Sequence, residues 1–305
     1  MSVLLIDIDS KIPNLALMKV SAYYKSQGIP VGFDIDVPDK AYISVIFAHN
    51  RAYGRSAASM LKALYPGIEI DIGGPGYDLH KVLPDCIESM QPDYSLYPEI
   101  DYAMGFTTRG CIRKCPFCIV PVKEGKLKHI QPIESIYRPE FDAIKLLDNN
   151  VMADRENFKH IVDFCEMHEL KLDVSQGLDI RLLDNELAAY IGRIRPMKTL
   201  TFAFDSLKYR SSVEKGVQLL KDHGVDVRRT VQFYVYCNRS DGEYGIKSAI
   251  ERCNILKSLE TNAYVMLDIN ELPTQEMKNL KRWANRKQLF WSISFDQYRM
   301  RGALA

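Results

Sequence analysis

The feature that most constrains the fold is an alternation of apolar, strand-like runs with helical patterns that begins near residue 102. The strand-like runs lie near residues 102–107, 143–147, 172–174, 199–204, 231–236 and 263–267. Right-handed crossovers place every helix outside the resulting parallel sheet and bring the carboxyl ends of the strands to one rim. The alternation therefore predicts an α/β fold with a partial (β/α)6 barrel of the TIM type over residues 101–270.

The first hundred residues carry a shorter alternation of the same kind. Helical patterns at 14–27 and 56–65 separate apolar runs at 3–8, 43–48 and 68–72. We expect a small N-terminal Rossmann-like α/β domain over residues 1–100. The remaining residues, 271–305, are expected to form a short C-terminal helical tail.

Composition and cysteine usage indicate the compartment. The start, MSVLLIDID, lacks a basic region followed by a long apolar stretch, and no window approaches 18 consecutive apolar residues. We therefore expect no signal peptide and no membrane span. The chain has 7 cysteines, an odd number, and three of them cluster, which favours metal ligation over a disulfide framework. A reducing, cytoplasmic location is expected.

The clustered cysteines are Cys111, Cys115 and Cys118, in a loop after the first predicted barrel strand. Their spacing is Cys-x3-Cys-x2-Cys, so three thiolates are offered. Closed zinc sites and ferredoxin clusters take four ligands, whereas three leave one iron of a [4Fe-4S] cluster open to an external ligand. We predict that these three cysteines bind an iron–sulfur cluster. The alternative is a zinc-containing nucleic-acid-binding module without catalysis, with a residue such as His129 as fourth ligand.

This spacing, with the aromatic residue Phe117 directly before the third cysteine, resembles the signature of the radical S-adenosylmethionine (SAM) superfamily. The resemblance covers roughly residues 102–270. It implies that the amino and carboxylate groups of SAM chelate the open iron, and that an electron splits the sulfonium into methionine and a 5′-deoxyadenosyl radical. That radical takes hydrogen from the substrate. An external electron donor, such as flavodoxin or ferredoxin, is implied as a partner.

The resemblance also implies where SAM is held. In the family the end of the second barrel strand contacts the SAM amino group, which here implies Asp148, Asn149 or Asn150, since acceptors suit an ammonium. In the family the ends of the third to fifth strands hold the ribose, carboxylate and adenine of SAM. Here Arg181 could pair with the methionine carboxylate, since a guanidinium matches that anion bidentately. An ordinary helix cap or surface ion pair is the alternative for each residue. Those later strand ends supply Gln176, Asp179, Arg181, Asp205 and Tyr236.

One further cysteine is a catalytic candidate. Cys237 ends the fifth predicted strand. Because that end is expected to face the reaction chamber, its thiol could donate a hydrogen atom. The other scattered cysteines are expected to be small buried core residues.

Two branches of the superfamily show local similarity. Residues 115–121, with Glu124 and Gly125 after them, are similar to methylthiotransferases, but those enzymes carry three more N-terminal cysteines and this chain has only Cys86 there. The N-terminal unit resembles that of cobalamin-type radical SAM enzymes, but no Asp-x-His-x-x-Gly element precedes Tyr102. We predict neither a second cluster nor cobalamin. Methylthiotransferase-like or methyltransferase activity on RNA or protein stays an alternative.

The charge distribution bears on the substrate. Basic residues surround the cysteine loop, namely Arg109, Arg113, Lys114, Lys123, Lys126 and Lys128. They favour an anionic substrate, a nucleotide or nucleic acid, over a peptide or neutral metabolite. Trp283 and Trp291 lie among basic residues near the C-terminus, where they could stack on bases. Their near-helical spacing equally fits the docking of a terminal helix.

Overall fold

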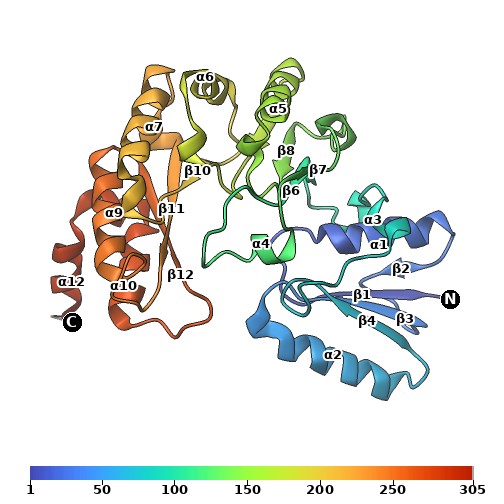
Figure 1. Ribbon diagram of the computed structural model, residues 1–305. Coiled ribbons are helices and arrows are strands. Elements are labelled where there is room, and N and C mark those ends of the chain that lie inside the picture. Colours follow the sequence, from blue (N-terminus) through green and yellow to red (C-terminus); the bar gives the residue numbers. More distant parts are fainter. Residues whose placement is uncertain (304–305) are drawn as a thin grey trace. The chain divides into compact units, whose positions relative to one another are not determined.

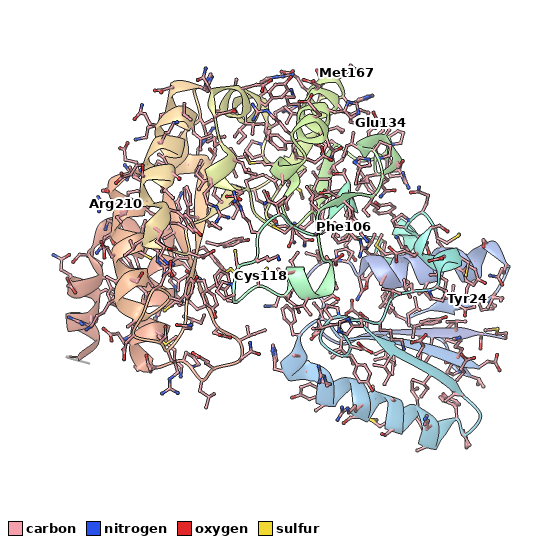
Figure 2. The ribbon with its side chains drawn as sticks, in the orientation of Figure 1. Tyr24, Phe106, Cys118, Glu134, Met167 and Arg210 are labelled. Carbon is pink, nitrogen blue, oxygen red and sulfur yellow. The ribbon has the colours of Figure 1, made fainter. Side chains whose placement is uncertain are left out.

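The computed structural model describes residues 1–303 and divides into two compact units (Figure 1 and Figure 2). The first unit comprises Met1–Asp101 together with Phe117–Gly125. The second comprises Tyr102–Pro116 and the chain from Lys126 onward. Both units combine parallel sheets with helices, so the predicted α/β class is confirmed. No helix within residues 1–303 is long and apolar enough to cross a membrane.

The first unit is built on one parallel sheet in the order β2-β1-β3-β4. Its strands are β1 (Val3–Asp7), β2 (Val31–Gly32), β3 (Lys40–Ser44) and β4 (Glu69–Gly73). Its helices are α1 (Leu15–Ser26), α2 (Arg51–Leu64), α3 (Asp85–Glu88) and α4 (Val120–Lys123), with 3-10 turns at Ala48–Asn50 and Tyr94–Leu96. The Asn14 side chain begins α1 by accepting a hydrogen bond from the Leu17 N–H at 3.3 Å.

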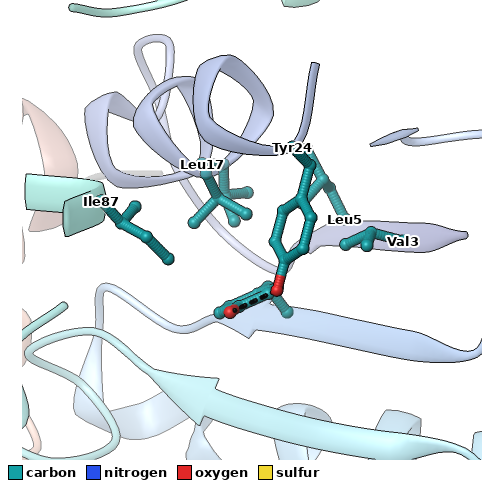
Figure 3. Close-up of a cluster of buried hydrophobic side chains, with 7 residues drawn as sticks. Val3, Leu5, Leu17, Tyr24 and Ile87 are labelled. Carbon is teal, nitrogen blue, oxygen red and sulfur yellow. Dashed lines mark hydrogen bonds between the residues drawn. The ribbon is translucent and has the colours of Figure 1, made fainter. Parts of the chain in front are cut away.

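Alternate residues of β1 pack against opposite layers of the first unit. Val3 and Leu5 join Leu17 and Tyr24 of α1 in one buried cluster, shown in Figure 3. Leu4 and Ile6 pack against the cluster that contains Leu61 of α2. The two helices thus cover opposite faces of the sheet, as the period of two along a strand requires.

The second unit contains two three-stranded parallel sheets and a short antiparallel ribbon. One sheet has the order β5-β8-β9, formed by β5 (Ala103–Gly105), β8 (Ala143–Leu146) and β9 (Lys171–Asp173). The other has the order β10-β11-β12, formed by β10 (Leu200–Ala203), β11 (Val231–Cys237) and β12 (Asn262–Leu267). Isolated parallel bridges join Leu172 to Pro196 and Leu178 to Phe202. The ribbon pairs β6 (Thr108–Arg109) with β7 (Lys128–His129).

Helices connect these strands and lie along them. Figure 1 shows α7, α9 and α10 on the same side of β10, β11 and β12. The helices are α5 (Arg155–Met167), α6 (Asn185–Arg193), α7 (Arg210–Asp222), α8 (Val227–Thr230), α9 (Ile246–Ser258), α10 (Gln275–Ala284), α11 (Lys287–Ser292) and α12 (Phe295–Ala303). Short 3-10 turns occupy Ile133–Ser135, Val151–Ala153, Ile180–Leu182 and Leu207–Tyr209.

Residues from 271 onward, predicted as a separate tail, belong to the second unit. Trp283 of α10 is fully buried and packs against Phe290 and Phe295. Its indole N–H donates to the Ile293 carbonyl at 3.1 Å. Trp291 donates instead to the side chain of Asn262 on β12, at 3.0 Å. Helix docking therefore accounts for the buried ring of Trp283, which has no face left for a base.

Candidate functional site

The start of the cysteine loop is held by one carboxylate that follows β8. Asp148 is buried and accepts hydrogen bonds from both the backbone N–H and the hydroxyl of Thr107, at 3.0 and 2.6 Å. The same two groups of Thr108 donate to it at 2.5 and 2.7 Å. With four donors on its two oxygens, Asp148 anchors the loop, and this placement leaves it little capacity to bind a ligand.

The next two residues continue this attachment along the loop. The side-chain oxygen of Asn149 accepts the Gly110 N–H at 3.1 Å. The side-chain amide of Asn150 donates to the Cys111 sulfur at 3.5 Å, and the Arg113 backbone N–H donates to the same sulfur at 3.3 Å. Residues 148–150, all predicted to lie at the SAM amino group, therefore all bind the loop that carries Cys111.

Asn150 keeps one acceptor that the protein does not satisfy. The residue is 4% exposed, and its Oδ1 is one of two buried side-chain polar atoms without a hydrogen-bond partner among residues 1–299, whose side chains the structure describes. A buried amide oxygen left unpaired costs roughly 1–3 kcal/mol. Its amide nitrogen contacts Cys111, so the unsatisfied oxygen lies beside the cysteine loop. An N–H or ammonium donor from a ligand would satisfy it, which fits the amino group of SAM.

Asp179 joins the cysteine loop to the turn after β9. Its carboxylate accepts the Arg113 Nε–H at 2.8 Å and the Arg181 Nε–H at 2.6 Å. Burial alone would raise the pKa of Asp179, but the hydrogen bonds and charges of the two arginines hold that pKa below its usual value. The ring of Tyr209 lies 4.5 Å from the Arg181 guanidinium carbon. The structure thus brings Asp179 and Arg181 together with Arg113.

Asp205 and Tyr236, at the ends of β10 and β11, also lie together. The Asp205 carboxylate accepts the Tyr236 N–H at 2.8 Å, and the Tyr236 hydroxyl donates to Asp268 at 2.6 Å. Burial raises the pKa of Asp205, opposed by the Tyr236 N–H and by the charge of Arg252. Arg252 is fully buried and donates to the carbonyls of Phe204 and Tyr236, each at 3.0 Å. This arginine fixes the two strand ends relative to each other.

Cys237 does not share the face of β11 that carries Tyr234 and Tyr236. It is fully buried, together with Val231, Phe233 and Val235, and α9 packs along this strand. We predicted that the Cys237 thiol faces a reaction chamber because it ends a strand whose carboxyl end was expected to face that chamber. In the structure, the period of two along β11 puts the thiol in the apolar layer between sheet and helix.

Three predicted residues lie on other segments of the chain. Gln176 is exposed on the turn after β9. Phe117 and Cys118 are partly exposed and belong to the segment Phe117–Gly125, which groups with the first unit. Of the three clustered cysteines, Cys111 and Cys115 belong to the second unit.

The described side chains offer no ready-made metal site. Within residues 1–299 no three His, Cys, Asp or Glu side chains form a group suited to a metal ion. The Nδ1 of His129 lies 3.6 Å from a carboxylate oxygen of Asp154.

Sequence reasoning missed the buried pair formed by Lys145 on β8 and Asp173 on β9. The Lys145 ammonium also donates to the Ser175 hydroxyl at 3.0 Å, and the Tyr234 hydroxyl donates to the Ser175 carbonyl at 2.7 Å. A lysine inside an apolar strand was the available signal, because buried charges require partners. Arg113 was counted only as a basic residue, since its partner is 66 positions away.

No protein-family model matches this sequence, and no curated protein matches it either.

Proposed function

We propose that this protein is a radical SAM enzyme. The observation that carries the proposal is the unsatisfied, buried oxygen of Asn150, on a residue whose amide nitrogen binds Cys111. The sequence contributes the Cys-x3-Cys-x2-Cys spacing, which leaves one iron of a [4Fe-4S] cluster open. Together these features describe a metal loop with an acceptor for an amino group beside it.

The six parallel strands support a partial (β/α)6 barrel as the scaffold. The order β5-β8-β9 is joined by parallel bridges to the region of β10, and β10-β11-β12 continues it. From β8 to β12 every crossover contains a helix of nine or more residues, whereas the β5–β8 connection holds the β6–β7 ribbon and the four-residue α4. In a barrel of this kind the residues after each strand meet on one rim. Residues 148–150, Asp179, Asp205 and Tyr236 all follow or end such strands.

Each part of the proposed site has a role. The three cysteines would hold the cluster, Asn150 would accept from the SAM amino group, and Asp205 with Tyr236 would contact ribose or adenine. When bound, the cofactor supplies radical chemistry that protein side chains lack. Asp148 and Asn149 would keep the loop in place. An external reductant of the flavodoxin or ferredoxin class is required, and a reducing cytoplasm suits such a cluster.

Anaerobic reconstitution with iron and sulfide tests the proposal. We expect iron and sulfide in the amounts of one [4Fe-4S] cluster, with a matching electron paramagnetic resonance signal after reduction. Cys111→Ala, Cys115→Ala and Cys118→Ala should each abolish it, whereas Cys86→Ala, an exposed cysteine of the first unit, should not. With SAM and reductant, the wild type should release 5′-deoxyadenosine slowly. Bound zinc in place of iron, or iron retained in the triple variant, would refute the proposal.

A further inference from the structure

Two guanidinium groups share one buried carboxylate beside the cysteine loop. Arg113 binds Asp179 through Nε, at 2.8 Å. Arg181 binds it through Nε and Nη2, at 2.6 and 3.0 Å. The Asp179 side chain is 5% exposed, whereas those of Arg113 and Arg181 are 34% and 21% exposed. One negative charge thus faces two positive charges, so these three side chains together carry an excess positive charge.

The two arginines keep unused donors that a ligand can reach. An arginine offers five N–H groups. Both terminal nitrogens of Arg113, and Nη1 of Arg181, make no hydrogen bond within the part of the chain that the structure describes. The Tyr209 ring against Arg181 fixes the plane of that guanidinium. The donors are therefore held in place before any ligand binds.

The other ionisable groups near Arg113, Asp179 and Arg181 do not neutralise this excess positive charge. Asp205 interacts with Arg181 only through the charges of the two groups, without a hydrogen bond between them. Its carboxylate accepts the Tyr236 N–H. The Tyr209 hydroxyl and the Cys115 thiol also influence Arg181, and neither is a carboxylate. Partly buried positive charge without a full counter-charge is unfavourable, and a bound anion removes that cost.

We propose that Arg113 and Arg181 form a binding site for a phosphoryl group of the substrate. A single carboxylate, such as that of SAM, is matched by one guanidinium fork, whereas two guanidinium groups can bind the several oxygens of a phosphoryl group. The backbone N–H of Arg113 donates to Cys111, so the anion would lie next to the cysteine loop. The substrate class is then a phosphorylated molecule such as a nucleotide. This assignment rests on the proposed function, but the anion binding does not.

Binding of inorganic phosphate and pyrophosphate to the full, metal-free chain tests the site. Equilibrium dialysis should show binding of at least one of these anions to the wild type. Arg113→Lys and Arg181→Lys keep the charge but lose the fork, and each should weaken binding roughly tenfold or more. Arg210→Lys is the matched control, because Arg210 of α7 binds Glu214 through Nε at 2.8 Å on the helix surface (Figure 2). Thermal melting verifies that each variant folds.

Two results would overturn the proposal at this stage: no binding of either anion to the wild type, or equal binding in the wild type and both Arg→Lys variants. A competition experiment on the reconstituted protein separates the substrate anion from the SAM carboxylate. Phosphate or pyrophosphate that stays bound at saturating SAM supports a substrate site. Competitive displacement by SAM, with weaker SAM binding in both variants, would assign the arginines to SAM and reject the substrate site. Failure of the proposed function is seen separately, as a failure to assemble the cluster.

Discussion

The hydroxyl and backbone N–H of Thr108 both donate to Oδ1 of Asp148, at 2.7 and 2.5 Å. These contacts span 40 positions of the sequence and join the loop of the cysteines to the end of β8. A carboxylate used in this way positions a loop. In the proposed site, the acceptor for the SAM amino group is therefore the neighbouring Asn150, whose buried Oδ1 has no hydrogen-bond partner.

Loss of this anchor should destabilise the second unit. Asp148→Ala leaves two backbone N–H groups and two hydroxyls without their acceptor, and each buried unsatisfied group costs about 1–3 kcal/mol. We expect the free energy of unfolding to fall by about 3 kcal/mol or more, measured by urea denaturation. Asp142→Ala is the control, because that exposed carboxylate makes only a surface ion pair with Lys171. An equal loss in both variants would argue against the anchoring role.

The buried pair of Lys145 and Asp173 should make stability depend on pH. Burial by itself raises the pKa of Asp173, but the hydrogen bonds from Lys145 and Ser175 and the Lys145 charge hold that pKa below its usual value. A carboxyl with a lowered pKa in the folded state stabilises the fold above its unfolded pKa, near 3.9. This contribution is lost as pH falls through the folded-state pKa.

We therefore expect Asp173→Asn to lower the free energy of unfolding by about 3 kcal/mol or more near pH 7, because it leaves a buried ammonium unpaired. As the pH falls below about 4, the free energy of unfolding should decrease less in the variant than in the wild type. Replacing both partners, as in Lys145→Met with Asp173→Leu, should restore much of the stability. Urea denaturation at several pH values measures all three effects. A variant with the same acid dependence as the wild type would contradict the assignment.

Local patterns in the sequence predicted the strands well where apolar runs are bounded by polar residues. The runs at 143–147, 231–236 and 263–267 coincide closely with β8, β11 and β12. The β6–β7 ribbon was not predicted, because its strands have two residues each and carry no hydrophobic period. Such a pairing is decided by the loop between the strands and by anchors such as Asp148.

The candidate site shows the same limit. The alternation of strands and helices predicted which polar residues follow the strands. Of these, residues 148–150 form hydrogen bonds with the cysteine loop. Which atom stays unsatisfied depends on contacts between distant residues, which no local pattern contains. The orientation of Cys237 depends on a shift of one residue along β11, and a strand end predicted to within one residue cannot fix it.

Thiol labelling should test that orientation. Burial raises the pKa of Cys237 to about 11, and those of Cys165 and Cys253 to about 12. At pH 8 these thiols stay protonated and covered, so they should react slowly with N-ethylmaleimide. The exposed Cys86 should react quickly. Peptide mass analysis over time gives the four rates. Labelling of Cys237 as fast as that of Cys86 would place its thiol at an accessible surface instead.

The last prediction concerns Asn150 and SAM. If its unsatisfied oxygen accepts from the SAM amino group, Asn150→Leu removes one hydrogen bond, and SAM affinity should fall roughly three- to tenfold. Asn150→Asp keeps an acceptor for the iron-bound amino group, so it should bind SAM more tightly than Asn150→Leu does. Asn279→Leu, on α10, is the control and should leave SAM affinity unchanged.

The measurement is calorimetric titration of SAM into protein reconstituted with iron and sulfide, with the iron content of each variant determined first. That step matters because the amide nitrogen of Asn150 also donates to the Cys111 sulfur at 3.5 Å, so a variant with less cluster would bind less SAM for a different reason. At equal iron content, weaker binding by Asn150→Leu than by the wild type reports on the side-chain amide, and tighter binding by Asn150→Asp than by Asn150→Leu reports on an acceptor at this position together with its charge. Equal SAM affinity in the wild type and Asn150→Leu would show that another group accepts from the amino group.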